Sequence, residues 1–293
     1  MELIKPLKSE HDMYLLLSWI VDSCDLDISL SIQKYGCLKT LEKLQTNFNP
    51  KYVKRLKTIN SFKDLKEILL KNEIQYISKI DPKWPNKLND LFEFEPLGLF
   101  FKGDFNILEK NCISIVGTRK ASSEGITTAT EIAFDLARLD FAVISGGAIG
   151  IDSSSHHGTL IADGYVVSIQ ANGLNKFYPS KNADLFRKVL KKGLILSEYP
   201  PYRSPTKISF LHRNRLIAAL SKATVVIEAQ KISGALSTAR YASKLGRHLL
   251  AVPGSIYSEN SAGTNELIKN REAEVVTNSQ DILEIVSPIG ANI

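Results

Sequence analysis

Two glycine-containing turns offer the clearest chemistry in the sequence. Each follows a short apolar run and precedes a helix-like segment: Gly117, Thr118 and Arg119 form the first turn, and Ser145, Gly146 and Gly147 the second. Such turns aim several backbone N–H groups at one point, and a helix N-terminus adds partial positive charge, so the expected ligand is a phosphate. The guanidinium of Arg119 can donate two hydrogen bonds to one phosphate, and its position suggests a nucleic acid as well as a free nucleotide.

Further phosphate-binding residues are expected at three later points of the chain. They are Lys176, Lys181 and Asn182 in a loop with aromatic residues, Arg213, Asn214 and Arg215 at an expected helix start, and Ser233, Gly234 and Arg240 at and along another helix. Lysine beside aromatic side chains suits a sugar–phosphate chain with unstacked bases. Residues 206–247 carry eight Lys or Arg against one acid, Glu228, which predicts a local positive field. Each of these features alone also fits an ordinary solvated surface.

No local signature indicates catalysis, a metal or a bound cofactor. The sequence has no recognisable Ser/His/Asp or Cys/His set and no P-loop lysine, and no acid follows the strand expected at 166–170 to hold a ribose. Asp152 is expected to cap a helix or bond its loop, and His156 and His157 lack companions for a metal site. Glu228 is expected to position an arginine as readily as to act as a base. We therefore expect a binding protein, not an enzyme, with no metal and no cofactor.

Composition indicates an ordinary globular protein. The chain has 293 residues, a formal net charge of +6, and three widely spaced cysteines (Cys24, Cys37 and Cys112) that favour a reducing, cytoplasmic setting. The longest apolar stretch, around residues 13–21, is too short to cross a bilayer, so we expect no membrane association.

The pattern of apolar residues predicts an α/β fold. Strands expected near 112–117, 142–145, 166–170, 194–197, 224–229, 249–253 and 274–276 alternate with helical segments. Such Val- and Ile-rich strands are typical of an extended Rossmann-like, doubly wound and mostly parallel sheet, whose ligands bind at the carboxyl ends of the strands. We expect a helical domain at 1–75, broken at Asn49-Pro50 and Asn60-Ser61. An aromatic and Pro-rich connecting segment at 76–106, the Rossmann-like domain at 107–287 and a tail at 288–293 should follow.

Taken together, these motifs resemble the DprA (also called Smf) family of DNA-processing proteins, over about residues 80–285. The resemblance is carried by Gly117-Thr118-Arg119, the stretch 144–152, Tyr178-Pro179 with Asn182, Ser197-Glu198, Phe210 with 213–215, Glu228-Ala229, Ser233-Gly234, 251–255 and 263–265. It implies a protein that binds single-stranded DNA without catalytic turnover. Such proteins protect incoming DNA during natural transformation, load the recombinase RecA onto it, and form homodimers through the Rossmann domain. It also implies a sterile-alpha-motif-like N-terminal domain, and DNA contacts by Arg119 and by Lys181 of the Tyr-Pro-x-x-Asn loop.

Two alternatives remain open from the sequence. One is a nucleotide-processing phosphoribohydrolase-like enzyme; the stretch comparable to that family's Pro-Gly-Gly-x-Gly-Thr-x-x-Glu motif, 233–240, lacks the catalytic glutamate and ends in Arg240. The other is a sensor that binds a free nucleotide, which fits the same glycine turns. Competition between a mononucleotide and an oligonucleotide would separate this sensor from a DNA-binding protein.

Overall fold

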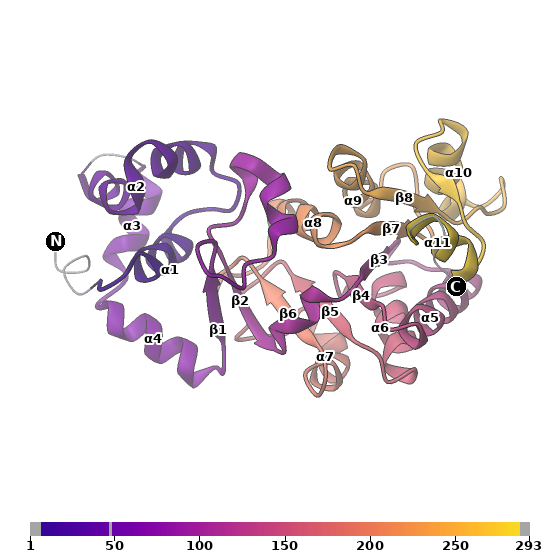
Figure 1. The fold of residues 1–293 in the computed structure, drawn as a ribbon, viewed down its shortest axis with the longest axis horizontal. Coiled ribbons are helices and arrows are strands. Elements are labelled where there is room, and N and C mark those ends of the chain that lie inside the picture. Colours follow the sequence, from indigo (N-terminus) through magenta and orange to yellow (C-terminus); the bar gives the residue numbers. More distant parts are fainter. Residues whose placement is uncertain (1–6, 47–48, 288–293) are drawn as a thin grey trace. The chain divides into compact units, whose positions relative to one another are not determined.

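The computed structural model describes residues 7–46 and 49–287, and the chain forms two compact units (Figure 1). The smaller unit holds the residues up to 102 together with 171–176 and 196–209, and the larger unit holds 103–170, 177–195 and the residues from 210 onward. The tail expected at 288–293 lies outside the described residues, and the expected domain limits stay a prediction. Within the described ranges, no helix combines the length and apolar character needed to cross a membrane.

The smaller unit begins with helices whose starts are set by polar caps. They are α1 (Glu10–Ile20), α2 (Leu26–Thr46), α3 (Pro50–Lys57) and α4 (Phe62–Lys71). The side chains of Ser9, Asn49 and Ser61 each accept a hydrogen bond from a backbone N–H in the first turn of the helix that follows. The expected breaks at Asn49-Pro50 and Asn60-Ser61 are therefore confirmed. Gly36, with φ +80°, interrupts α2, because this left-handed conformation suits glycine.

A pair of antiparallel strands follows these helices. β1 (Gln75–Ser78) pairs antiparallel with β2 (Gly98–Gly103), with Gln75 opposite Phe101, and the short helix η1 (Asn86–Phe94) joins them. The strand β1 was not expected from the sequence, because its four residues carry no alternating pattern long enough to stand out.

The larger unit is built from alternating strands and helices, as expected. It contains η2 (Phe105–Glu109), β3 (Cys112–Val116), α5 (Ser123–Arg138), β4 (Ala142–Ser145), α6 (Ile151–Ile161), β5 (Val166–Gln170), η3 (Ser180–Asn182), α7 (Ala183–Val189), β7 (Ala223–Val226), α9 (Gly234–Lys244), β8 (His248–Ala251), η4 (Glu259–Ser261), α10 (Ala262–Lys269), β9 (Glu274–Val275) and α11 (Ser279–Val286). The chain also forms β6 (Leu194–Ser197) and α8 (Lys207–Leu220). The mostly parallel, Rossmann-like architecture predicted from the sequence is confirmed.

The strand order creates a switch point between β3 and β7. In the larger unit the strands follow the order β5-β4-β3-β7-β8-β9, so the chain moves one way from β3 to β5 and the opposite way from β7 to β9. Because crossovers between parallel strands are right-handed, α5 and α6 cover one face and α9 the other (Figure 1). The loops that follow β3 and β7 therefore diverge and leave a crevice at the carboxyl edge.

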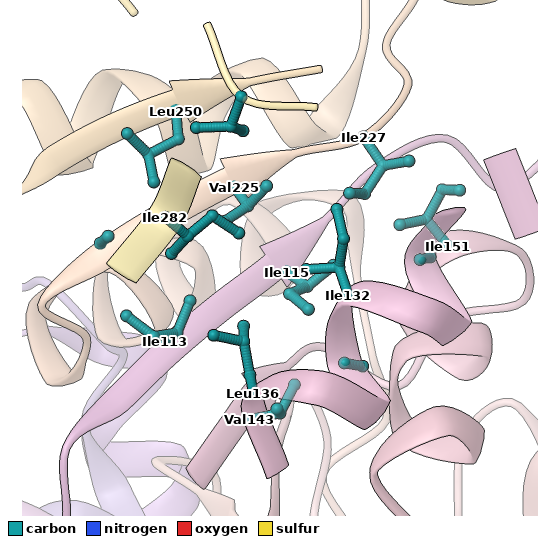
Figure 2. Close-up of a cluster of buried hydrophobic side chains, with 14 of the residues drawn as sticks. Ile113, Ile115, Ile132, Leu136, Val143, Ile151, Val225, Ile227, Leu250 and Ile282 are labelled. Carbon is teal, nitrogen blue, oxygen red and sulfur yellow. The ribbon is translucent and has the colours of Figure 1, made fainter. Parts of the chain in front are cut away.

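The core of the larger unit lies between the sheet and α5. Ile113 and Ile115 project from one face of β3 and pack with Val225 of β7 and with Ile132 and Leu136 of α5 (Figure 2). All five side chains are at most 3% exposed. Burial of this kind stabilises the fold by about 1.5–3 kcal/mol per large aliphatic side chain. The packed strands give the loops at the carboxyl edge a rigid base.

Candidate nucleic-acid interface

A pocket of about 320 Å³ occupies the crevice between the loops that follow β3 and β7. Six of the residues expected to bind phosphate line it, and these are Gly117, Arg119, Arg213, Asn214, Ser233 and Gly234. Gly117 and Arg119 follow β3, Ser233 and Gly234 follow β7, and the carboxyl ends of these two strands share one edge. The pocket is thus formed where the strand order reverses.

The two glycine turns are locked against each other. A Cβ on Gly117 would come 2.5 Å from the side chain of Ile151, and one on Gly150 (φ +90°) would come 2.4 Å from the carbonyl oxygen of Thr118. The N–H of Ile151 donates to that same carbonyl at 3.3 Å. Glycine at these points lets the turns approach closely, and the approach fixes the backbone that carries Arg119.

Arg213 holds the second glycine turn through hydrogen bonds. Its side chain is 5% exposed, and Nη1 donates to the carbonyl oxygens of Gly146, at 2.9 Å, and of Ile169. A Cβ on Gly146 would come 2.4 Å from this guanidinium nitrogen. Hydrogen bonds from a charged donor are stronger than neutral ones, so Arg213 fixes the turn as well as lining the pocket.

Arg119 is exposed at the opening of the pocket. Its guanidinium lies 5.0 Å from the ring centroid of Phe210, and that ring lies 5.7 Å from the ring of Tyr178. Arg213 approaches the same Phe210 ring at 5.8 Å. A cation stacked on an aromatic face keeps its N–H groups free to point sideways at an anion. The arrangement therefore offers a phosphate contact and an aromatic surface side by side.

Phe210 and Tyr178 were not among the site residues expected from the sequence. Phe210 lies three residues before Arg213 in α8, so both occupy the same face of the helix. That spacing could have identified Phe210, since it was already part of the motif around the two arginines. Nothing in the spacing of Tyr178 indicates its contact, which arises from the fold.

The loop after β5 is bonded to the second glycine turn through its asparagine. Nδ2 of Asn182 donates to the carbonyl oxygen of Gly147 at 3.0 Å, where Gly147 has φ +68°. Ser145 is buried, and its hydroxyl donates to the carbonyl oxygen of Ile115 at 2.6 Å. Asn182, Gly147 and Ser145 thus hold the turn and do not line the pocket. Lys181 is exposed beside Asn182.

Two other expected site residues stand apart from the pocket lining. Lys176 is exposed and belongs to the smaller unit, and its role stays a prediction. Arg240 is exposed on α9, where Nε donates to the carbonyl oxygen of Leu236 at 3.3 Å, and its role likewise stays a prediction. At the start of the same helix, Ser233 accepts a hydrogen bond from the N–H of Ala235, as an N-cap does.

The expected helix start at Arg213 is wrong. α8 begins at Lys207, and Thr206 before it exchanges hydrogen bonds with Ser209 in its first turn. Arg213 and Arg215 therefore lie inside the helix, without free backbone donors, and residues two apart point to different sides. Arg215 is 1% exposed, donates to the carbonyl oxygen of His212 at 2.8 Å and does not line the pocket, so its position gives no support to a DNA contact.

The acids near the pocket bond the loops. Asp152 is 7% exposed, and its carboxylate accepts from the N–H of Ala148 at 3.2 Å, as expected. Burial raises the pKa of Asp152, against the opposing effects of Arg213, this N–H, Ser145 and Arg119. Glu228 was expected to position an arginine or act as a base, but it accepts from the N–H and the hydroxyl of Ser122, the N-cap of α5, and so holds the start of that helix.

A buried histidine lies in α6, the helix that follows the second glycine turn. His156 on α6 is fully buried, and neither ring nitrogen has a hydrogen-bond partner among the described residues. Burial lowers the pKa of His156 to about 3, with smaller contributions from His157 and Arg213, so the ring is neutral at pH 7. Within 7–46 and 49–287, no group of three metal-ligating side chains comes together.

Comparison with known proteins identifies relatives of this chain. Residues 75–287 match the family model described as DNA recombination-mediator protein A. The putative DNA processing protein DprA of Mycobacterium tuberculosis is 37% identical over 236 residues, which cover 76% of this chain and 60% of that protein. DNA processing protein DprA of Bacillus subtilis is 35% identical over 214 residues, which cover 73% of this chain and 70% of that protein. The chain thus spans about 60% of the length of the first of these relatives.

Solved structures similar to this chain include two DNA processing proteins. DNA processing protein A of Streptococcus pneumoniae has a TM-score of 0.81 at 29% identity and covers 96% of this chain and 99% of its own. A structure of DNA processing protein A of Helicobacter pylori, whose description concerns its binding mode for single-stranded DNA, has a TM-score of 0.66 at 30% identity. It covers 73% of this chain and 96% of its own.

Proposed function

Because the chain belongs to the DNA recombination-mediator protein A family, we propose that it binds single-stranded DNA at the pocket between the loops after β3 and β7. The observation that carries this proposal is the exposed guanidinium of Arg119 stacked on Phe210 at the mouth of that pocket. A sugar–phosphate chain needs cations at its backbone and π-faces for its bases, and this cluster supplies both.

The charges and burial at the pocket favour an anion that approaches from solvent. Arg119, Lys120 and Arg213 line the pocket, and the single acid among its lining residues is the buried Asp152. Arg119 and Lys120 are exposed, whereas Arg213 is committed to the glycine turn. Arg119 is therefore the residue we expect to contact a phosphate directly, and Lys181, exposed in the loop after β5, is a second candidate.

The related Helicobacter pylori protein, whose description names single-stranded DNA as its ligand, supports the choice of a polynucleotide. From the description of its family we further propose that the protein acts as a non-catalytic recombination mediator. It protects incoming DNA during natural transformation, loads RecA onto it, forms a homodimer through the larger unit, and works in the cytoplasm.

The binding proposal is tested with labelled oligo-dT, a duplex of the same length, and dTMP as a competitor. We expect tight binding of oligo-dT, weaker binding of the duplex, and displacement by dTMP only at large excess. Arg119→Ala should weaken oligo-dT binding. Arg138→Ala is the matched control: Arg138 is exposed at the end of α5, toward the opposite edge of the sheet, and its guanidinium lies 6.0 Å from the Phe134 ring. Equal affinities for wild type and Arg119→Ala, or dTMP binding as tightly as oligo-dT, would overturn the proposal.

RecA loading is tested separately. On single-stranded DNA coated with a single-strand binding protein, the wild-type chain should shorten the lag before RecA hydrolyses ATP, and Arg119→Ala should not. An unchanged lag with the wild-type chain would reject the loading role while leaving DNA binding intact.

A further inference from the structure

Three apolar side chains of the larger unit are almost fully exposed. Ile232 is 96% exposed, Tyr257 is 92% exposed and Ile256 is 83% exposed. No other large apolar side chain described in that unit exceeds 80% exposure, and the next is Ile161, at 69%. Exposed apolar groups that gather on one side of a protein commonly mark a binding surface.

These three residues lie on two neighbouring loops at the carboxyl edge of the sheet. Ile232 follows β7, and Ile256 and Tyr257 follow β8, which pairs with β7. The two loops are joined by backbone hydrogen bonds: the N–H of Ala229 donates to the carbonyl oxygen of Asn260, and the N–H of Gly263 to that of Ala229, both at 2.7 Å. We call these two loops, residues 229–233 and 253–261, the apolar rim.

The apolar rim is continuous with the pocket. Ile232 lines both, and Nδ2 of Asn260 donates to the carbonyl oxygen of Lys120, a residue of the pocket, at 2.8 Å. A strand seated against Arg119 would therefore meet the rim next, if it leaves the pocket on the β7 side.

The rim loop after β8 is held in shape by its own hydrogen bonds. Gly254 and Asn265 bond each other reciprocally, from backbone N–H to Oδ1 at 3.2 Å and from Nδ2 to backbone carbonyl at 3.0 Å. The N–H of Ser258 donates to the carbonyl oxygen of Ser255 at 3.0 Å. Ile256 and Tyr257 are thus displayed at the tip of an ordered turn, and the apolar surface is built into the loop.

We infer that the unpaired bases of a strand bound at the pocket continue over the apolar rim, where the ring of Tyr257 stacks on a base and Ile232 and Ile256 pack beside it. This rests on the proposed function. Lys231 lies on the rim and Lys120 lies next to it, and both are exposed. Glu259 is the single charged residue of 252–261. An exposed aromatic ring on a rim that adjoins this pocket and its exposed lysines fits a base better than it fits an apolar helix of a protein partner.

The test compares two strands with equal numbers of phosphates: dT20 and an abasic 20-mer. Tyr257→Ala should weaken dT20 binding by roughly 5- to 100-fold, the loss typical of one base–aromatic stack, and leave the abasic strand unchanged. Tyr257→Phe keeps the ring and should retain wild-type affinity. Ile161→Ala, which removes an exposed apolar side chain at the other edge of the sheet, is the matched control and should change neither affinity.

The outcomes separate this inference from the proposed function. If Arg119→Ala weakens binding of both strands while Tyr257→Ala weakens neither, the rim does not contact bases and the inference fails alone. If Arg119→Ala weakens neither strand, the pocket proposal fails. A loss of equal size on both strands with Tyr257→Ala would also overturn the inference, because stacking needs a base. Tyr257→Ala should fold normally, since the side chain is 92% exposed, and a thermal melt verifies this.

Discussion

Replacing the two pocket arginines one at a time should separate support of the glycine turn from contact with DNA. Arg213→Ala removes a buried guanidinium that donates to the carbonyl oxygens of Gly146 and Ile169. A hydrogen bond from a charged group contributes about 1.5–3 kcal/mol, and a buried group left unpaired adds to the loss. We therefore expect Arg213→Ala to lower the free energy of unfolding by about 3–5 kcal/mol.

Arg119→Ala should behave in the opposite way. The side chain is exposed, and its contact with the Phe210 ring at 5.0 Å contributes at most about 1 kcal/mol. Its loss should weaken oligo-dT binding roughly tenfold or more, because a charge-assisted contact to phosphate disappears.

Urea denaturation followed by circular dichroism measures the first effect, and fluorescence anisotropy with labelled oligo-dT measures the second. The reasoning is refuted if Arg213→Ala unfolds at the wild-type urea concentration. It is equally refuted if Arg119→Ala destabilises the fold as much as Arg213→Ala while leaving DNA affinity unchanged.

Three further predictions concern buried histidine, close backbone packing and assembly. The fold lowers the pKa of His156 to about 3, whereas in the unfolded chain this histidine binds a proton below about pH 6.5. The contribution of the neutral ring to the free energy of unfolding is therefore fully present above pH 6.5 and is lost as the pH falls toward 3. At pH 5 the loss is about 2 kcal/mol. Urea titrations across this range should show a shallower loss for His156→Leu than for wild type, and parallel curves would contradict the assignment. Gly150→Ala should lower the melting temperature and weaken oligo-dT binding, because Gly150 has φ +90° and the new Cβ would come 2.4 Å from the carbonyl oxygen of Thr118. Gly234→Ala is the control and should melt like wild type, because nothing lies within 4 Å of its Cβ. Equal melting temperatures of the two variants would contradict this prediction. Our candidate for the surface of the proposed homodimer is the edge strand β9, where Val275 is 48% exposed. Sedimentation should show a monomer for Val275→Asp, and an unchanged dimer would exclude this surface.

The sequence predicted the sheet and its glycine turns well, because both follow from local patterns. Short Val- and Ile-rich runs identify buried parallel strands, and the order of the elements implies that their carboxyl ends meet at one edge. Gly117 and Gly147 could therefore be assigned to this edge without knowledge of the strand order.

The errors have three separate causes, two of them local and one tertiary. The start of α8 depends on the turn at Thr206 and Ser209, which carries no apolar pattern, so the helix was expected six residues too late. Arg213, Asn214 and Arg215 were treated as one cluster, although residues two apart on a helix point in different directions. Glu228 was misjudged because its partner, Ser122, is distant in the sequence and is brought near by the pairing of β3 with β7.

The central claim is that Arg119 contacts a phosphate of the bound strand. The salt dependence of oligo-dT affinity tests this contact directly. A plot of log K against log salt concentration should be about 0.7 shallower for Arg119→Ala than for wild type, the change expected when one phosphate contact to a single strand is lost. Arg138→Ala should keep the wild-type slope. Three parallel lines would contradict the claim that the edge of the sheet at β3 and β7 holds the backbone of a single strand.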